Sequence, residues 1–150
     1  MNKAFVKESE DETSPKCPAC LAIGQPVGAA TLRRHLVEGA GLHLAASSAN
    51  FCPNPTCDVA YFDANRQTVN IDKLRSVMWP KSQSPAAILC PCLNVTAAHV
   101  FEDARRKDPA RVRSIVNQSK AHPQRCAELN ICGCPCVAEA QRLYLKNVGK

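Results

Sequence analysis

Ten cysteines at short spacings constrain this chain more than any other feature of its 150 residues. They fall into two groups. The first is C-x2-C followed, after 31 residues, by C-x4-C. The second is C-x-C followed, after 33 residues, by four more cysteines within eleven positions. A chain of this length forms one ordinary domain or two small ones, and small units commonly need a metal ion or a disulfide for stability.

The cellular compartment decides between disulfides and metal. The N-terminal stretch MNKAFVKESEDETSPK lacks an apolar segment followed by a small-residue cleavage site, so we expect no secretory signal. No stretch approaches the roughly 18 apolar residues of a membrane helix. We therefore expect a cytoplasmic protein without membrane insertion. In a reducing compartment, close cysteine pairs favour metal or redox chemistry over structural disulfides.

Composition divides the chain into four parts. Residues 1–15 are rich in charged and poor in apolar side chains, and we expect them to form a disordered tail. Residues 16–79 contain the first cysteine group and are expected to form a zinc-binding module. Residues 80–89 are polar and bounded by prolines, as is typical of a linker. Residues 90–150 contain the second group and are expected to form a helical module.

The pattern of apolar residues predicts an α+β fold. Helices are predicted at 31–38, 71–78, 96–107, from 109 onward, and 137–147. A strand is predicted at 59–62, with 67–70 as its hairpin partner across a polar turn. The run from 126 to 136 is predicted to be turn-like.

The first cysteine group has the spacing of a structural zinc site. Zinc takes four ligands in a tetrahedron, and two thiolates on a tight turn supply two adjacent positions. Four thiolates leave no position for water, so the binding energy of the metal would contribute to folding. The predicted ligands are Cys17, Cys20, Cys52 and Cys57. Two alternatives stay open: a thioredoxin-like redox pair at 17 and 20, and His35 in place of one cysteine.

The second group suits an iron–sulfur cluster better than a single zinc ion. C-x-C spacing is tight for two ligands on one zinc, whereas a [2Fe–2S] cluster takes four thiolates, two on each iron. Cys90, Cys92 and Cys126 are the first three candidates, and one of the three late cysteines is the fourth. Cys92 and Cys136 each precede a predicted helix, whose N-terminus stabilises negative charge.

The order of these motifs resembles the N-terminal half of CopZ-type copper chaperones. That order is a CPxC and C-x4-C knuckle, a V-x-Y-F strand, a linker, C-x-C, and late cysteines ten residues apart. The second half is also similar to bacterioferritin-associated ferredoxin domains. The resemblance covers about residues 16–148 and implies structural zinc at the first group. For the second group it implies a [2Fe–2S] cluster on Cys90, Cys92, Cys126 and Cys136.

The resemblance also implies a role in copper homeostasis, with a copper-transporting or redox protein as partner. Longer family members carry a G-M-x-C-x-x-C copper loop, a motif not found among these residues. Cys132 and Cys134 either compete with Cys136 for the fourth cluster position or contribute to a Cu(I) site, because soft thiolates favour Cu(I). His99 and His122 are weaker candidates for iron, because six cysteines already exceed four positions.

The formal net charge of +6 is not taken as a sign of nucleic-acid binding. Four thiolates lower the charge by two on a zinc ion, and by two again on an oxidised cluster, which leaves about +2. Aromatic residues for base stacking are few. The basic residues between 105 and 125 form either a solvated helix surface or a docking site for an acidic partner. No catalytic motif is visible, so we expect no enzyme. A ferredoxin-like electron carrier without a copper role and a zinc-only adaptor remain alternatives.

Overall fold

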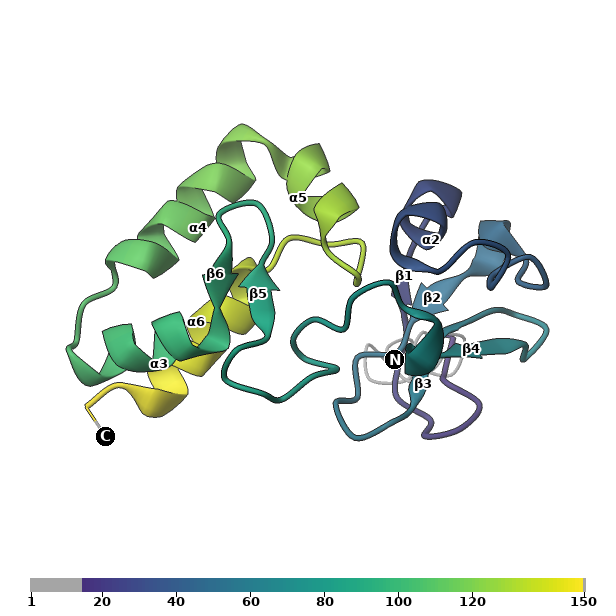
Figure 1. Cartoon of the computed structure of the whole chain (residues 1–150), viewed down its shortest axis with the longest axis horizontal. Helices are drawn as coiled ribbons and strands as arrows, with labels where there is room; N and C mark the ends of the chain where they lie inside the picture. The colour runs from purple at the N-terminus through teal and green to yellow at the C-terminus, as the bar shows by residue number, and fades with distance from the viewer. Residues whose placement is uncertain (1–14, 150) are drawn as a thin grey trace, which may run out of the picture.

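A computed structural model describes residues 15–149, which form two lobes lying side by side (Figure 1). The predicted disordered tail, residues 1–15, lies outside the described residues except for its last position. The N-terminal lobe is built on an antiparallel sheet, and the C-terminal lobe is mainly helical. The mixture of helices and antiparallel sheets confirms the α+β class.

The sheet of the N-terminal lobe has the order β1-β2-β3-β4, with every neighbouring pair antiparallel. Its strands are β1 (Gln25–Pro26), β2 (Asn50–Phe51), β3 (Val59–Phe62) and β4 (Thr68–Asn70). The β3–β4 pairing confirms the predicted hairpin. Asp63 begins its turn, and its carboxylate accepts hydrogen bonds of 2.9 Å from the N–H groups of Asn65 and Gln67. The first lobe therefore forms around a locally encoded hairpin.

Helix α2 (Ala29–His35) lies beside this sheet, and its bounds differ from the prediction at both ends. The predicted helix at 71–78 is wrong, because the structure has a short 3-10 helix, η2 (Ile71–Lys73), there. The physical reason is that Leu36 and Leu74 form an antiparallel bridge. This bridge keeps the chain extended after α2 and after η2. A second 3-10 helix, η1 (Ala46–Ser48), precedes β2.

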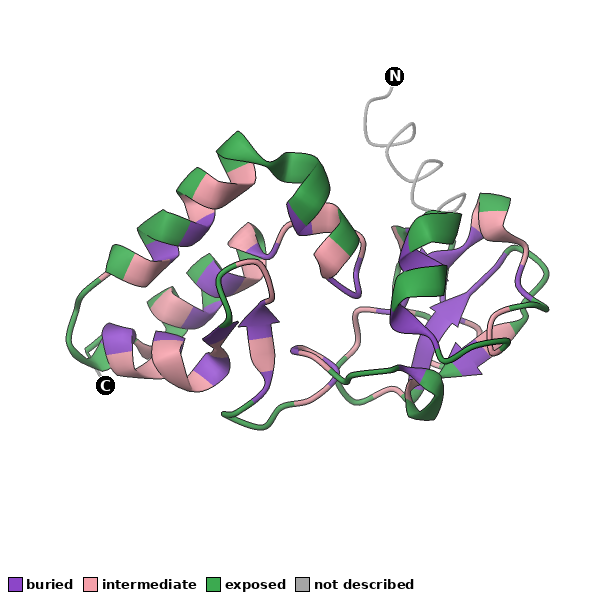
Figure 2. Cartoon of the chain, turned by 45° about the horizontal axis from the view of Figure 1, so that its top comes forward, coloured by how far each residue is buried: buried purple, intermediate pink, exposed green. Residues whose placement is uncertain are grey.

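Strand β3 is buried along its whole length, and Figure 2 shows β2 and β3 as a largely purple sheet. A bulge between Val59 and Tyr61 interrupts the regular alternation of sides. As a result, Tyr61 packs in the larger core, edge-to-face with Phe51 at 5.9 Å between ring centroids. Val59 and Phe62 pack beside the first cysteine group. Thus β3 separates the main core of the lobe from its sulfur-rich side.

The C-terminal lobe consists of a short hairpin and four helices. Its elements are β5 (Ile88–Cys90), β6 (Val95–Thr96), α3 (Ala97–Arg105), α4 (Ala110–Ala121), α5 (Pro123–Leu129) and α6 (Val137–Asn147). Thr96 caps α3: its Oγ1 accepts from the His99 N–H, and the His99 ring accepts from the Thr96 N–H. Helix α5 differs from the prediction. It starts at Pro123 and includes residues 126–129, which were expected to be turn-like. Among residues 15–149, no helix combines the length and apolar character needed to cross a membrane.

Residues 130–135, which we call the strap, connect α5 to α6 and reach back to the N-terminal lobe. Ile131 is completely buried and belongs to the core of that lobe, together with Cys132. The Tyr61 hydroxyl donates a hydrogen bond of 2.5 Å to the Ile131 carbonyl. In the other direction, Trp79 lies in the core of the C-terminal lobe, where its indole N–H donates to Glu139. The two lobes therefore share side chains across their contact.

Candidate metal centres

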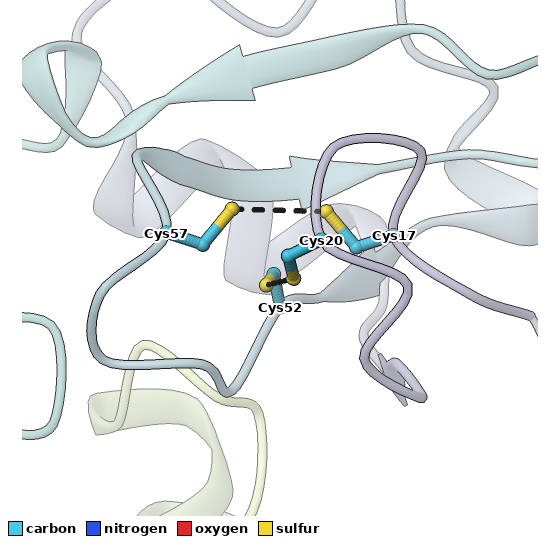
Figure 3. A group of neighbouring side chains, drawn as sticks. All are labelled: Cys17, Cys20, Cys52 and Cys57. Atoms are coloured by element: carbon cyan, nitrogen blue, oxygen red, sulfur yellow. Dashed lines mark hydrogen bonds between the residues drawn. The ribbon is translucent and has the colours of Figure 1, made fainter.

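The first centre brings four cysteine sulfurs together from two turns of the N-terminal lobe (Figure 3). The sulfurs of Cys17, Cys20, Cys52 and Cys57 all lie within 4.8 Å of one another. The Cys17 and Cys57 sulfurs are 3.9 Å apart, and those of Cys20 and Cys52 are 3.5 Å apart. A tetrahedral zinc ion with bonds of about 2.3 Å places its sulfurs roughly 3.8 Å apart. The donor set and its spacing therefore fit zinc.

Each cysteine of the first turn has a close partner in the second turn. Cys17 lies next to Cys57, and Cys20 lies next to Cys52. The first turn is closed by the Leu21 N–H, which donates to the Cys17 carbonyl at 2.8 Å. All four sulfurs are therefore within reach of one shared metal ion, whereas a thioredoxin-like site would need only the first two cysteines.

Two of the three histidines that were weighed as ligands, His35 and His99, have other contacts. His35 is buried on α2, and its Nε2 lies 3.0 Å from the carbonyl of Glu128 in α5. The ring of His99 takes part in the cap of α3. Both side chains therefore hold helices in place, and neither is among the four residues gathered at the first centre.

The thiols of the first centre cannot all ionise readily without a metal ion. Burial raises the pKa of Cys52 to about 12, and burial also raises the pKa of Cys57. Burial acts in the same direction on Cys20, but hydrogen bonds from Asn54, Ala22 and the neighbouring cysteines outweigh it and lower its pKa to about 6. One thiolate is thus favoured and others are opposed. A divalent cation supplies the charge that allows four thiolates to form.

The second centre collects four cysteines from four places in the C-terminal lobe. Cys90 ends β5, Cys92 follows it in the turn to β6, Cys126 lies in α5, and Cys136 precedes α6. The sulfurs of Cys92 and Cys126 are 3.6 Å apart. Cys136 lies near enough to Cys90 for each thiol to shift the pKa of the other. The structure therefore places these residues as two pairs, and they do not form a group whose sulfurs all lie within 4.8 Å of one another, as those of the first centre do.

The close cysteine pairs shift the pKa values of their thiols. The neighbouring Cys136 thiol lowers the pKa of Cys90 to about 6 against the effect of burial, helped by the N–H groups of Leu93 and Cys92. The neighbouring Cys90 thiol, together with burial, raises the pKa of Cys136. Burial and the neighbouring Cys92 raise the pKa of Cys126 to about 11. As in the first centre, a cationic group is needed before all four thiols ionise.

The sequence predicts that two helix N-termini, after Cys92 and after Cys136, stabilise negative charge at the second centre. The structure has this arrangement at Cys136 only. Cys136 is the N-cap residue of α6. The N-terminus of α3, however, is occupied by backbone carbonyls: the Ala97 N–H donates to Ala87 and the Ala98 N–H donates to Pro85. Those carbonyls come from the segment predicted to be a linker. The first two N–H groups of α3 are therefore hydrogen-bonded to the preceding segment and do not donate to sulfur.

Cys132 and Cys134, in the strap, are apart from both centres. They are joined to each other by a disulfide. Cys132 belongs to the core of the N-terminal lobe, and Cys134 packs against that core with its sulfur 3.8 Å from the Gln25 side-chain oxygen. Of the three late cysteines, Cys136 is the one beside Cys90.

Comparison with known proteins bears on the first lobe most directly. Residues 14–75 match the family model of the CopZ-type zinc-binding domain. The first lobe is therefore similar to CopZ-type zinc-binding domains. Across 86% of this chain, the fold matches the crystal structure of the Archaeoglobus fulgidus CopZ N-terminal domain, with 97% of that chain covered. The TM-score is 0.69 and the sequence identity is 24%, which establishes a shared fold. No curated protein sequence matches the chain.

One residue that supports the CopZ-like zinc module was missed by sequence reasoning. Lys81 is only 6% exposed, and its ammonium group donates to the carbonyls of Asn54 at 2.8 Å and Cys57 at 2.9 Å. Its charge also acts to lower the pKa of Cys52. Lys81 lies in a polar, proline-bounded stretch that is typical of an exposed linker, so no local signal pointed to its burial.

Proposed function

We propose that the chain is a metal-binding protein of copper homeostasis that carries structural zinc in the first lobe and a redox-active [2Fe–2S] cluster in the second. The observation that carries the proposal is the pairing of four thiols, Cys90 with Cys136 and Cys92 with Cys126. A [2Fe–2S] cluster takes two thiolates on each iron, so two pairs are the donor set that it needs. The shared fold with a CopZ N-terminal domain supports the same proposal.

The residues of the second lobe would hold such a cluster and limit its contact with water. When bound, the cluster would supply one-electron transfer. Cys90, Cys126 and Cys136 are buried, whereas Cys92 is half-buried and is followed by the more exposed Leu93. The turn after β5 is therefore the side from which an electron would enter or leave. An apolar residue at that edge suits a transient contact with a partner protein.

In this role the protein binds and transfers electrons or metal ions rather than catalysing a reaction. One-electron chemistry at the cluster would keep copper as Cu(I), the form that soft thiolates bind. The partner would be a copper-transporting or redox protein, met in the cytoplasm. Family resemblance supports the copper role, and the thiol pairing supports the cluster.

The test is metal analysis and spectroscopy of protein purified without oxygen. We expect one zinc and two irons per chain, a red-brown colour, and an EPR signal after one-electron reduction. Cys136→Ser should abolish or strongly alter the visible spectrum, because it removes the partner of Cys90. Cys132→Ser is the matched control at the other end of the same segment and should leave the visible spectrum unchanged.

The same preparation separates the alternatives. A colourless protein with two zinc ions would contradict the cluster and favour a zinc-only adaptor. A coloured protein that fails to bind Cu(I) in an anaerobic titration would favour a ferredoxin-like electron carrier. Stoichiometric Cu(I) binding by the reduced protein, lost in the Cys132→Ser/Cys134→Ser double variant, would support copper handling by the late cysteines.

A further inference from the structure

The strap is shaped so that two of its cysteines meet. Cys132 and Cys134 are separated by one residue, with their Cα atoms 5.3 Å apart and their sulfurs bonded. The residue between them, Gly133, has φ of 69°, in the left-handed region that favours glycine. A Cβ atom at this position would also lie 2.9 Å from a methyl carbon of Val27. Backbone conformation and contact with the N-terminal lobe thus both require the glycine that lets the sulfurs approach.

The disulfide borders a small cavity between the two lobes. The cavity has a volume of about 120 Å³, and Cys132, Cys134 and Cys136 contribute to its wall, as do Trp79 and Glu139. Cys132 is 8% exposed, while Cys134 is half-buried. Of the two bonded cysteines, Cys134 is therefore the more exposed residue.

The position of the strap connects this bond to both lobes. On one side, Ile131 is anchored in the N-terminal core, with its carbonyl bonded to Tyr61. On the other side, only Pro135 separates Cys134 from Cys136, which lies beside Cys90 in the second centre. Breaking or forming the disulfide therefore changes a short segment that is held at one end by Ile131 and at the other by Cys136.

We propose that Cys132 and Cys134 form a reversible dithiol–disulfide site, a two-electron redox site separate from both metal centres, which exchanges with dithiol reductants. The sulfur chemistry is that of ordinary thiol–disulfide exchange. The cavity gives the reductant access to Cys134, and the strap transmits the change of state to the contact between the lobes.

The exchange proceeds in two balanced steps. A thiolate of the reductant attacks the Cys134 sulfur, forms a mixed disulfide and releases Cys132 as a thiolate, which takes up a proton. The second thiol of the reductant, as its thiolate, then attacks its own sulfur in the mixed disulfide and releases Cys134, which is protonated in turn. The protein gains two electrons and two protons, and the reductant becomes a cyclic disulfide.

The experiment is a redox titration of the full chain, purified without oxygen, in buffers of reduced and oxidised dithiothreitol. Free thiols are labelled in the native protein with a light alkylating reagent. The protein is then unfolded and reduced, and the remaining thiols are labelled with a heavy reagent. Trypsin cleavage after Arg125 and Arg142 yields one peptide that contains all four late cysteines, so each label is assigned on the same peptide.

We expect Cys132 and Cys134 to change from heavy to light label together as the buffer becomes more reducing. The labels of Cys126 and Cys136 should not change over the same range. In Cys134→Ser, Cys132 should no longer respond to the buffer, because its bonding partner is gone. Hydrogen exchange of the strap amides should rise several-fold on reduction of the wild type. In the Cys132→Ser/Cys134→Ser variant it should be high in every buffer.

Three outcomes would overturn the proposal. The first is light label on both cysteines in every native buffer, which would mean that the bond does not form. The second is heavy label on both cysteines in every native buffer, which would make the disulfide a purely structural bond that the reductant does not reach. The third is a joint transition of all four cysteines, which would assign the redox response to the second metal centre. The visible spectrum, recorded in parallel, reports on the cluster independently.

Discussion

Lys81 is a buried cation that supports the zinc-binding turn. Replacing it in Lys81→Met keeps the length of the side chain but leaves the carbonyls of Asn54 and Cys57 without their donor. We expect the free energy of unfolding of the N-terminal lobe to fall by about 1–3 kcal/mol, the usual cost of unpaired buried polar groups. We also expect faster loss of zinc to a chelator, because the turn that presents Cys52 and Cys57 is less well held.

Both quantities can be measured by urea unfolding and by competition with a coloured zinc chelator. Lys120→Met provides the control, because Lys120 is exposed on α4. That variant should match the wild type within error. Equal zinc retention in the Lys81→Met variant and the wild type would contradict the supporting role of the lysine.

Tyr61 provides a second test at a single residue, in the contact between the lobes. Tyr61→Phe retains the ring, which is completely buried, and removes the hydroxyl that donates to the Ile131 carbonyl. We expect a loss of about 1–3 kcal/mol in unfolding free energy, because a buried carbonyl is left unpaired. Urea unfolding measures the loss. Tyr144→Phe is the control, because Tyr144 is a half-buried tyrosine that packs against the core of the C-terminal lobe.

Among the elements, helix α3 depends on the residue that precedes it, its N-cap Thr96. Thr96 supplies one half of a capping box and His99 the other. Thr96→Ala should destabilise the C-terminal lobe by about 1 kcal/mol, whereas Thr96→Ser, which retains the hydroxyl, should cost much less. The change in unfolding free energy can be followed by circular dichroism. Equal stability of the two variants would show that the hydroxyl does not carry the cap.

Elements defined by neighbouring residues were predictable, and elements defined by distant partners were not. The β3–β4 hairpin follows from alternating residues around a short polar turn, and α6 follows from its apolar periodicity. The predicted helix at 71–78 is wrong because Leu74 pairs with Leu36. These residues are far apart in the sequence, so no local pattern predicts their contact. Helix α5 was not predicted, because closely spaced cysteines are typical of turns and its local helix signal is only the proline at its start.

The candidate sites show the same division. Short spacings were enough to select Cys17 and Cys20 with their two partners, because a metal ion gathers ligands from tight turns. Spacing alone left the last position of the second centre open among three cysteines. In the structure Cys136 lies beside Cys90, whereas Cys132 packs in the core of the N-terminal lobe, and Cys136 as the fourth ligand stays a prediction.

At the scale of the whole molecule, His35 makes the contact between the lobes sensitive to pH. Burial lowers the pKa of His35 from its ordinary 6.5, with Arg34 acting in the same direction and the hydrogen bond to Glu128 opposing it. As pH falls below the ordinary value, the unfolded chain takes up a proton before the folded chain does. The free energy of unfolding should therefore decrease towards acid pH, until the folded-state pKa is passed.

This prediction is checked by urea unfolding at a series of pH values for the wild type and for His35→Gln, which keeps a donor but cannot be protonated. The other ionisable groups are common to both proteins and cancel in the comparison. The stability advantage of the wild type should shrink as pH falls from 7.5 to 5.5, values chosen to span the ordinary histidine pKa. Parallel curves would show that His35 does not contribute to the pH dependence.

The shared core also has a consequence for the order in which the protein is made. The zinc ligands of the first lobe are complete once Cys57 has left the ribosome, so all four thiols are available to a metal ion before the rest of the chain is made. The core beside them stays incomplete until Ile131 arrives, 70 residues after the tyrosine that binds its carbonyl. Domains of many proteins finish folding one after another during translation. In this protein the first half of the nascent chain can bind its metal early, but its core is completed only after the second half has been made.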